Sequence, residues 1–336
     1  MVSAAANGGR ILTSLLVYGP VPSRRLGRSL GINNIPPKKC SYSCIYCQLG
    51  STTDMQIKRS AFYQPLELAR NVRERVRQLR EKRELIDYLA FVPDGEPTLD
   101  INLGKEIELL RALGIKIAVI TNASLIWSED VQQDLQKADW VCLKVDSVTP
   151  DIWGSIDRPH EKIKLDNILE GMLGFAKSFQ GELTSETMLI RGINDSDLEV
   201  SKIATFLAEL KPTKAYLAIP TRPPAERIEP TNEQTLNTAY QTFSKKLSRV
   251  EYLIGYEGNA FSSTGNAADD LASITAVHPM REEAVKGLLD QLNIGWETVQ
   301  ELINNGSLVE LEYQGKKFYA RRLPTWGQAD KRRIAS

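Results

Sequence analysis

The sequence predicts an α/β protein with a mainly parallel sheet, followed by a smaller domain. Over roughly the first 250 residues, short apolar segments typical of strands alternate with longer segments of helical periodicity. Strands separated by helices of this length form right-handed parallel units. The repeats are too few for an eightfold barrel, so an incomplete barrel or an open doubly wound sheet is expected. Near residue 269 the pattern changes, which predicts the second domain.

The individual elements follow in chain order. The first predicted strand, residues 26–32, leads into a cysteine-rich loop. A helix is predicted next, from apolar residues that recur at helical spacing: Leu66, Ala69, Val72, Val76 and Leu79. Later strands are predicted at residues 86–92, 115–121, 140–145, 183–190, 215–219 and 252–256. Helices are predicted between them at residues 102–113, 128–137, 166–179, 196–210 and 231–247.

The composition restricts the possible partners. Lysine plus arginine and aspartate plus glutamate number 42 each in 336 residues, so the formal net charge is zero. Any affinity for nucleic acid must therefore come from local basic patches. No run approaches the length of a membrane-spanning helix, and residues 11–17 are too short for one. We expect a cytoplasmic protein with reduced thiols and no membrane partner.

Three of the four cysteines lie within eight positions. Cys40, Cys44 and Cys47 have the spacing C-x3-C-x2-C, which suits an iron-sulfur cluster better than a disulfide framework. A 4Fe-4S cluster with three protein ligands leaves one iron open for a reactant. A zinc site would need a fourth ligand, and the only histidines, His160 and His278, are far away in sequence. The fourth cysteine, Cys142, is expected to be a small buried residue.

This spacing, with Tyr46 just before the last cysteine, resembles the signature of the radical S-adenosylmethionine (SAM) superfamily. The resemblance implies a partial (β/α)6 TIM-like barrel, a 4Fe-4S cluster on the three cysteines, and SAM as second cofactor. In that family the reduced cluster cleaves SAM to methionine and a 5′-deoxyadenosyl radical, which abstracts hydrogen from a substrate. The resemblance also implies a low-potential electron donor, ferredoxin or flavodoxin, as partner.

Within the superfamily, residues 15–260 look like the uncharacterised iron-sulfur oxidoreductases related to the tRNA wyosine-base synthases. The similar stretches are residues 20–32, the cysteine motif, residues 95–99 and the Lys-Val-Asp sequence at 144–146. Wyosine synthases carry a second cluster, for which this chain has too few cysteines. Wyosine formation is therefore not expected here.

Several residues of the resemblance are candidate SAM contacts. Gly95, Glu96 and Pro97 resemble the family's G-G-E-P turn, whose backbone holds the amino end of SAM, and Tyr46 belongs to the cysteine motif. Asp94 stands where glycine or serine is commoner. Asn122, in a Thr-Asn-Ala-Ser sequence after the third predicted strand, is expected near SAM. Ala218 or Ile219 would lie beside the adenine.

The fourth predicted strand allows an inference from geometry alone. Because side chains alternate along a strand, Cys142, Lys144 and Asp146 share one face and the aliphatic residues between them share the other. If helices cover the aliphatic face, the polar set points inward, as a structural ion pair or as a functional site. The resemblance favours contacts with SAM for Lys144 and Asp146. By the same alternation Glu186 faces inward with Met188, and Lys144 and Glu186 are the candidate catalytic residues.

A basic cluster precedes the cysteine loop. Arg24, Arg25 and Arg28 are expected near the mouth of the cluster site. They would meet an anionic substrate there, or they are solvated loop charges.

The second domain, expected at residues 263–336 after a first domain of residues 1–262, has the element order of a winged helix. Two helical stripes are followed by a hairpin of residues 308–313 and 318–320 around Gln314-Gly315. The stripes are Ala284, Val285, Leu288, Leu289 and Leu292, then Trp296, Val299, Leu302 and Ile303. Basic residues on or beside the wing offer phosphate contacts: Lys316, Lys317, Arg321 and Arg322. A peptide-binding wing and a structural cap are the alternatives.

Together these features predict a radical SAM oxidoreductase that abstracts hydrogen from a macromolecular substrate, with RNA ahead of a peptide. The C-terminal domain is expected to deliver that substrate, and truncation after Gly265 to leave SAM cleavage intact. The alternatives are a peptide- or protein-modifying radical SAM maturase and a non-catalytic, metal-stabilised nucleic-acid-binding protein.

Overall fold

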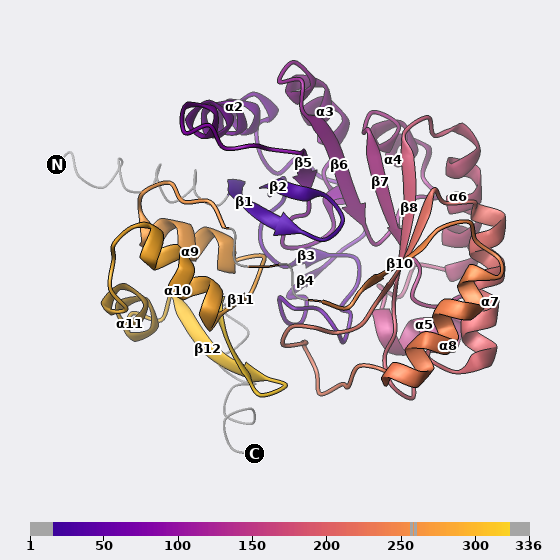
Figure 1. Cartoon of the computed structure of the whole chain (residues 1–336). Coiled ribbons are helices and arrows are strands. Elements are labelled where there is room, and N and C mark those ends of the chain that lie inside the picture. Colours follow the sequence, from indigo (N-terminus) through magenta and orange to yellow (C-terminus); the bar gives the residue numbers. More distant parts are fainter. Residues whose placement is uncertain (1–15, 256–257, 259–260, 323–336) are drawn as a thin grey trace.

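The computed structural model describes residues 16–255, 258 and 261–322. Three segments considered in the sequence analysis lie outside these residues: most of the segment 11–17, the end of the strand predicted at 252–256, and the last residues of the predicted second domain. Among the described residues no helix is long and apolar enough to cross a membrane. The described chain forms one large sheet with helices on its outer face, and a smaller C-terminal region beside it (Figure 1).

The large sheet has eight strands in the order β1-β2-β5-β6-β7-β8-β9-β10. Their bounds are β1 Val17–Ser23, β2 Gly27–Ile32, β5 Tyr88–Phe91, β6 Lys116–Thr121, β7 Trp140–Lys144, β8 Glu182–Met188, β9 Lys214–Ala218 and β10 Val250–Leu253. From β2 to β10 every neighbouring pair is parallel. Six of these strands fall at the predicted positions, and β10 begins two residues before the strand predicted at 252–256 and ends at its second residue. The parallel α/β expectation is confirmed.

The antiparallel edge strand β1 was not predicted. It pairs with β2 and has an irregular register between Tyr18 and Val21. Its sequence contains Gly19, Pro20 and Pro22, which are normally turn residues. An edge strand tolerates prolines because one of its sides makes no ladder hydrogen bonds to the sheet.

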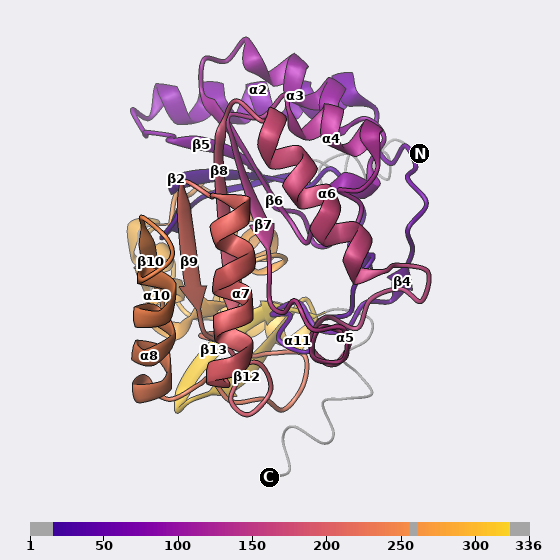
Figure 2. The ribbon, with the colours of Figure 1, turned by 90° about the vertical axis from the view of Figure 1, so that its right-hand side faces the viewer.

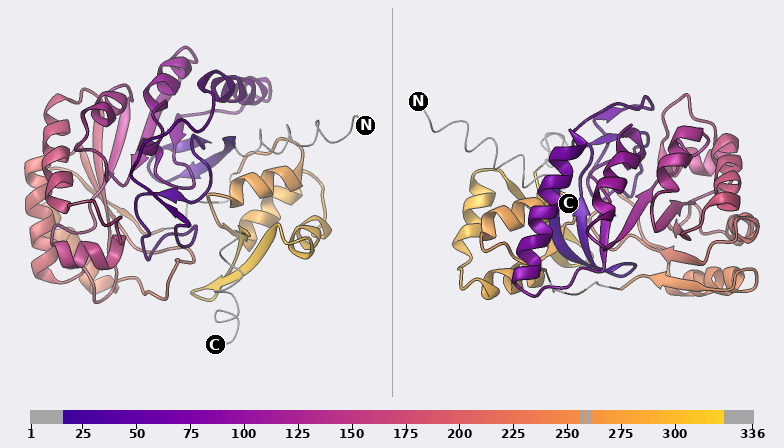
Figure 3. Two further views of the ribbon diagram at one scale, coloured as in Figure 1. Left: turned by 180° about the vertical axis from the view of Figure 1, so that it is seen from behind. Right: turned by 90° about the horizontal axis from the view of Figure 1, so that it is seen from above.

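Each parallel crossover of the sheet contains at least one helix. The helices are α2 Pro65–Glu81, α3 Leu103–Arg111, α4 Glu129–Leu135, α5 Pro150–Asp157, α6 Leu165–Ser178, α7 Asp197–Leu210 and α8 Glu233–Ser244. Figures 2 and 3 show them around the outside of a curled sheet, with the inner face turned away from them. This arrangement is an incomplete barrel and not a doubly wound sheet, which would carry helices on both faces.

Side-chain alternation in β7 follows the prediction. Val141, Leu143 and Val145 belong to the large core between the sheet and its helices. Trp140 and Cys142 belong instead to a smaller cluster on the inner face, built from strand and loop residues. The inner face is therefore where Lys144 projects, because it has the same parity as Cys142.

The C-terminal region contains α9 Ala267–Thr275, β11 Met280–Arg281, α10 Glu282–Gln291, α11 Glu297–Asn304, β12 Leu308–Tyr313 and β13 Lys316–Arg321. Both predicted helices and the hairpin are present, and α9 is an additional helix. The three strands form a second sheet in the order β11-β13-β12. This region shares a hydrophobic core with β1, because Tyr18 and Val21 pack among its apolar residues. The predicted domain boundary at residue 262 falls in the connection between β10 and α9 and stays a prediction.

Candidate functional site

The cysteine loop follows β2 and lies over the carboxyl ends of the strands. The Glu96 amide, just after β5, donates to the Lys39 carbonyl at 3.1 Å. The Ile45 amide donates to the carbonyl of Ile156, in the α5 segment that follows β7, at 2.9 Å. Parallel barrels place their reactive groups at this end of the strands.

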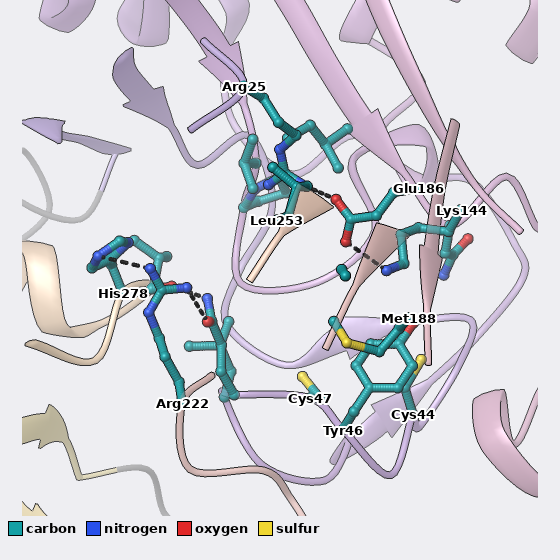
Figure 4. Close-up of a pocket in the computed structure, with 18 of the residues that line it drawn as sticks. Arg25, Cys44, Tyr46, Cys47, Lys144, Glu186, Met188, Arg222, Leu253 and His278 are labelled. Atoms are coloured by element: carbon teal, nitrogen blue, oxygen red, sulfur yellow. Dashed lines mark hydrogen bonds and ion pairs between the residues drawn. The ribbon is translucent and has the colours of Figure 1, made fainter. Parts of the chain in front are cut away.

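The three motif cysteines line a single cavity of about 330 Å³. Figure 4 shows Cys44 and Cys47 close to Tyr46 on one side of this space. Cys142 is fully buried in the inner-face cluster and is not part of the cavity wall. The structure thus brings together the three cysteines that the sequence selects and leaves the fourth apart.

The donor set fits an iron-sulfur cluster. All four cysteines are free thiols. Burial raises the pKa of the Cys40 thiol to about 12 and that of Cys44 well above its ordinary value, and a bound metal cation would favour the thiolate form. Among the described residues, no group of three His, Cys, Asp or Glu side chains is arranged to hold a metal ion. Three thiols that line one cavity suit the three protein ligands of a 4Fe-4S cluster.

Lys38 is a neighbour of the cysteines that the sequence analysis missed. Its side chain is buried, and its Nζ lies 3.8 Å from Cys47 Sγ and 2.7 Å from the Gly50 carbonyl. An ammonium at this place stabilises a thiolate and the negative charge that three thiolates bring to a cluster. The two consecutive lysines at 38–39, directly before Cys40, were the feature of the sequence that could have indicated a positive charge beside the cysteines.

The Gly95-Glu96-Pro97 turn meets the cysteine loop at very short range. A Cβ on Gly95 would lie 2.0 Å from the Lys39 carbonyl oxygen, so only glycine permits this approach. Gly95 and Glu96 line the cavity, whereas Pro97 starts the short helix η1 Pro97–Leu99 and is buried. Gly95 and Glu96 therefore lie at the cavity wall, and their contact with SAM stays a prediction.

The Glu96 carboxylate already has protein partners. Its Oε1 accepts from Thr121 Oγ1 at 2.6 Å and from the Thr98 amide at 3.0 Å, and its Oε2 accepts from the Asn122 amide at 2.8 Å. Asn122 lines the cavity, and its Nδ2 donates to Ser41 Oγ at 3.0 Å and lies 3.6 Å from Cys40 Sγ. Glu96 thus joins the ends of β5 and β6 and holds Asn122 against the cysteine loop.

The inward-facing residues of β7 and β8 form one network with Tyr46. Lys144 Nζ donates to Glu186 Oε1 at 2.8 Å and lies 3.7 Å from Asp146 Oδ1. The same ammonium lies 4.9 Å from the centroid of the Tyr46 ring, and the Tyr46 hydroxyl donates to Asp146 Oδ2. Lys144, Glu186 and Tyr46 line the cavity, but Asp146 is 2% exposed and lies behind them. The structure therefore places Asp146 as a support for Tyr46 and Lys144.

The predicted basic cluster divides into two parts. Arg24 and Arg25 line the cavity, and Arg25 forms an ion pair with Glu186 Oε2. Arg28 is exposed, and its backbone amide donates to Asp87 Oδ2 at 2.7 Å. The expectation of basic residues at the mouth of the site thus applies to Arg24 and Arg25, while Arg28 lies outside the cavity lining.

Asp157 is a second residue that sequence reasoning missed. It ends α5, and its Oδ1 accepts from Cys44 Sγ at 3.3 Å and lies 3.4 Å from the Tyr46 hydroxyl. Burial, followed by the nearby Asp146 charge, raises the pKa of Asp157 well above its ordinary value. A Thr-Pro-Asp start at residues 149–151 indicates the helix, but no local pattern indicates where its last residue contacts the chain.

An apolar wall completes this side of the cavity. Ala218 and Ile219, at the end of β9, line it together with Met188 and Leu253. Ala218 or Ile219 is the position where the adenine of SAM is expected. That contact stays a prediction.

The C-terminal region forms part of the same cavity. Val277 and His278, which follow α9, are lining residues. Gln48, the residue after the last motif cysteine, donates through Nε2 to the Val277 carbonyl at 2.9 Å. Nearby, Leu49 packs in one hydrophobic cluster with Val309 and Ala320 of the hairpin, with Cys47 at its edge. The C-terminal region therefore contacts the cysteine loop directly, which the sequence analysis did not foresee.

Comparisons with known proteins identify the family. A family model described as the radical SAM superfamily matches residues 34–202, about half of the chain. The chain belongs to the radical SAM superfamily. Over 311 residues it is 47% identical to a UPF0026 protein of Methanocaldococcus jannaschii, a match that covers 92% of this chain and 96% of that protein. The name of this relative states no activity.

Solved radical SAM structures share the fold. A radical SAM methyltransferase from Sphaerobacter thermophilus superimposes with a TM-score of 0.51 at 16% identity, covering 67% of this chain and 66% of that chain. TYW1 with a lysine-pyruvate adduct bound superimposes with a TM-score of 0.50 at 17% identity, covering 66% of this chain and 74% of that chain. The curled eight-stranded sheet is thus the radical SAM fold.

Family membership settles the type of protein and its cofactors. The chain is an enzyme, and a 4Fe-4S cluster and SAM are its cofactors. The alternative of a non-catalytic nucleic-acid-binding protein is therefore wrong. The cavity supplies the three thiols and the polar network described above, so the residues present fit both groups.

Proposed function

We propose that this radical SAM enzyme abstracts a hydrogen atom from a substrate that enters the cavity between the barrel and the C-terminal region. The observation that carries the proposal is that Cys40, Cys44 and Cys47 share one cavity with Lys144 and Glu186. When bound, the cluster and SAM supply a 5′-deoxyadenosyl radical. The protein must position the reacting groups and exclude water from them.

Each cavity residue has a proposed part in this reaction. Cys40, Cys44 and Cys47 are the cluster ligands, and the Gly95 backbone and Asn122 bind the amino-acid end of SAM. Tyr46 and Lys144 contact SAM as well, held in place by Asp146. Lys144 and Glu186 are proposed to be catalytic, because their 2.8 Å hydrogen bond places an exchangeable proton at the cavity wall.

We propose RNA as the substrate class. The cavity wall carries five lysines and arginines, namely Arg24, Arg25, Lys38, Lys144 and Arg222, against the two carboxylates Glu96 and Glu186. This excess of positive charge supports an anionic substrate. The C-terminal region has the helix and strand order of a winged helix, and exposed Lys316 and Arg322 on or beside its hairpin offer further phosphate contacts.

A peptide is the second candidate, favoured by the charge of the C-terminal region. Between residues 267 and 322 nine Asp and Glu side chains outnumber six Lys and Arg side chains. Lys317, on the hairpin, forms an ion pair with Glu310 at 2.9 Å. Both observations weaken this surface as a docking site for a phosphate backbone.

Two further proposals concern the cellular setting. A low-potential ferredoxin or flavodoxin is the proposed electron donor, because cleavage of SAM consumes one electron. The cytoplasm is the proposed compartment, since the four free cysteines suit a reducing environment.

The test uses the anaerobically reconstituted enzyme with SAM, a reductant and either total RNA or total peptide from a host lysate. We expect RNA to increase 5′-deoxyadenosine formation and to do so less as salt rises, because each phosphate contact releases counterions. If only peptides increase 5′-deoxyadenosine formation, and salt does not change this effect, the substrate is a peptide and not RNA. Formation of no 5′-deoxyadenosine under any condition would refute the proposed reaction.

A further inference from the structure

A second polar wall faces the cavity, opposite the Lys144 and Glu186 pair. Figure 4 shows Arg222 and His278 on one side of the view and Lys144 and Glu186 on the other, with Cys47 between them. Arg222 comes from the loop after β9, and His278 comes from the C-terminal region. Two segments far apart in the sequence therefore bring an arginine and a histidine to the same wall.

The guanidinium of Arg222 is held in a defined orientation. Its Nη1 donates to Gln48 Oε1 at 2.8 Å, and its Nη2 lies 3.1 Å from His278 Nε2. Gln48 is itself fixed, because its Nε2 donates to the Val277 carbonyl. A planar guanidinium with fixed orientation loses little side-chain entropy when it binds a ligand, and its fork of N–H groups matches a phosphate.

The contact between Arg222 and His278 is also informative. Arginine has no acceptor, so Arg222 Nη2 donates a hydrogen bond to the imidazole nitrogen His278 Nε2 at the cavity wall. An anion that entered between them would replace this hydrogen bond, accepting from the guanidinium and from Nε2–H of the histidine in its other tautomer or protonated form. Because Gln48 follows Cys47 directly, such an anion would lie close to the cluster end of the cavity.

We propose that Arg222 and His278 form a subsite for a phosphate group of the substrate. This subsite rests on the proposed function, since it holds the substrate while the opposite wall binds SAM. The phosphate belongs to the nucleotide whose sugar or base reacts, either within RNA or as a free nucleotide. Gln48 is a positioning residue that sets the orientation of Arg222.

The experiment measures phosphate binding to the anaerobic holoenzyme saturated with SAM, by isothermal titration calorimetry with inorganic phosphate. We expect wild-type enzyme to bind phosphate, and Arg222→Gln and His278→Gln to bind it about ten- to a hundredfold more weakly, as for the loss of a hydrogen bond to a charged group. Arg191→Gln is the matched control, because Arg191 is an exposed arginine that pairs with Glu229 outside the cavity. Visible absorbance of each variant verifies that the cluster is still present.

Competition identifies the source of the phosphate. A short single-stranded RNA that displaces phosphate better than a nucleoside 5′-monophosphate assigns the subsite to RNA, and the reverse order assigns it to a free nucleotide. No phosphate binding, equal binding by both variants and wild type, or better displacement by acetate than by either nucleotide would overturn the proposal. The same wild-type preparation is also tested for 5′-deoxyadenosine formation. If it forms this product but does not bind phosphate, the subsite is refuted while the proposed reaction stands.

Discussion

Asp94 offers a test of how burial shapes the turn beside the cysteine loop. Its side chain is 3% exposed, and neither carboxylate oxygen has a hydrogen-bond partner within the described structure. Burial raises the pKa of Asp94 from 3.8 to about 7, although the charges of Lys38 and Arg321 act in the opposite direction. A carboxyl group with a raised pKa in the folded state opposes folding where it is ionised. The native state therefore loses stability as pH rises from about 4 to about 7.

The size of the effect follows from the pKa values. A rise from 3.8 to about 7 corresponds to about 4 kcal/mol of lost stability above pH 7, at 1.36 kcal/mol per pH unit. Asp94→Asn removes the charge and keeps the shape, so the variant should gain stability relative to wild type as pH rises. Between pH 5 and pH 8 the gain should grow by roughly 2.6 kcal/mol, which is on the order of 4 °C in melting temperature.

The assay is thermal unfolding of the two proteins at a series of pH values, followed by far-ultraviolet circular dichroism. Asp290→Asn, at an exposed position of α10, is the control and should show no such growth with pH. A constant difference between Asp94→Asn and wild type across the series, or a variant that is less stable at pH 8, would refute the reasoning.

Three further outcomes are expected. Cys40→Ala, Cys44→Ala or Cys47→Ala should each lose bound iron and visible absorbance, while Cys142→Ala keeps both; loss in the Cys142 variant would contradict the ligand assignment. Lys144→Met should weaken SAM binding about ten- to a hundredfold in equilibrium dialysis with the cluster retained, and unchanged SAM binding would reduce Lys144 to a structural role. Truncation after Gly265 should lead to loss of the bound cluster, because it removes the residues that cover Leu49 beside Cys47. A cluster that stays bound in the truncated enzyme would show instead that the C-terminal region is an independent domain.

Local sequence patterns were enough to predict most strands and helices of the barrel and some residues of the site. The strand periodicity of two was enough to place Lys144 and Glu186 on the inner face, where they form a 2.8 Å hydrogen bond. The cysteine spacing identified three thiols that line one cavity. These features were predictable because each depends on residues a few positions apart.

Contacts across the chain were not predictable in this way. Gln48 and Arg222 are separated by 174 positions, and Arg222 and His278 by 56, so no local pattern joins them. Asp157 reaches Cys44 only because α5 packs over the cysteine loop. The edge strand β1 was missed because its prolines are turn signals everywhere except at the edge of a sheet.

The account rests most on the claim that the three-cysteine cavity binds SAM at a cluster with an open iron. Electron paramagnetic resonance of the reduced, anaerobically reconstituted enzyme, with and without SAM, tests this claim most directly. We expect a 4Fe-4S signal whose spectrum changes when SAM is added, and a smaller change in Asn122→Ala, whose side chain lies against the cysteine loop. A spectrum that is identical with and without SAM, or a colourless protein that holds zinc, would contradict the account.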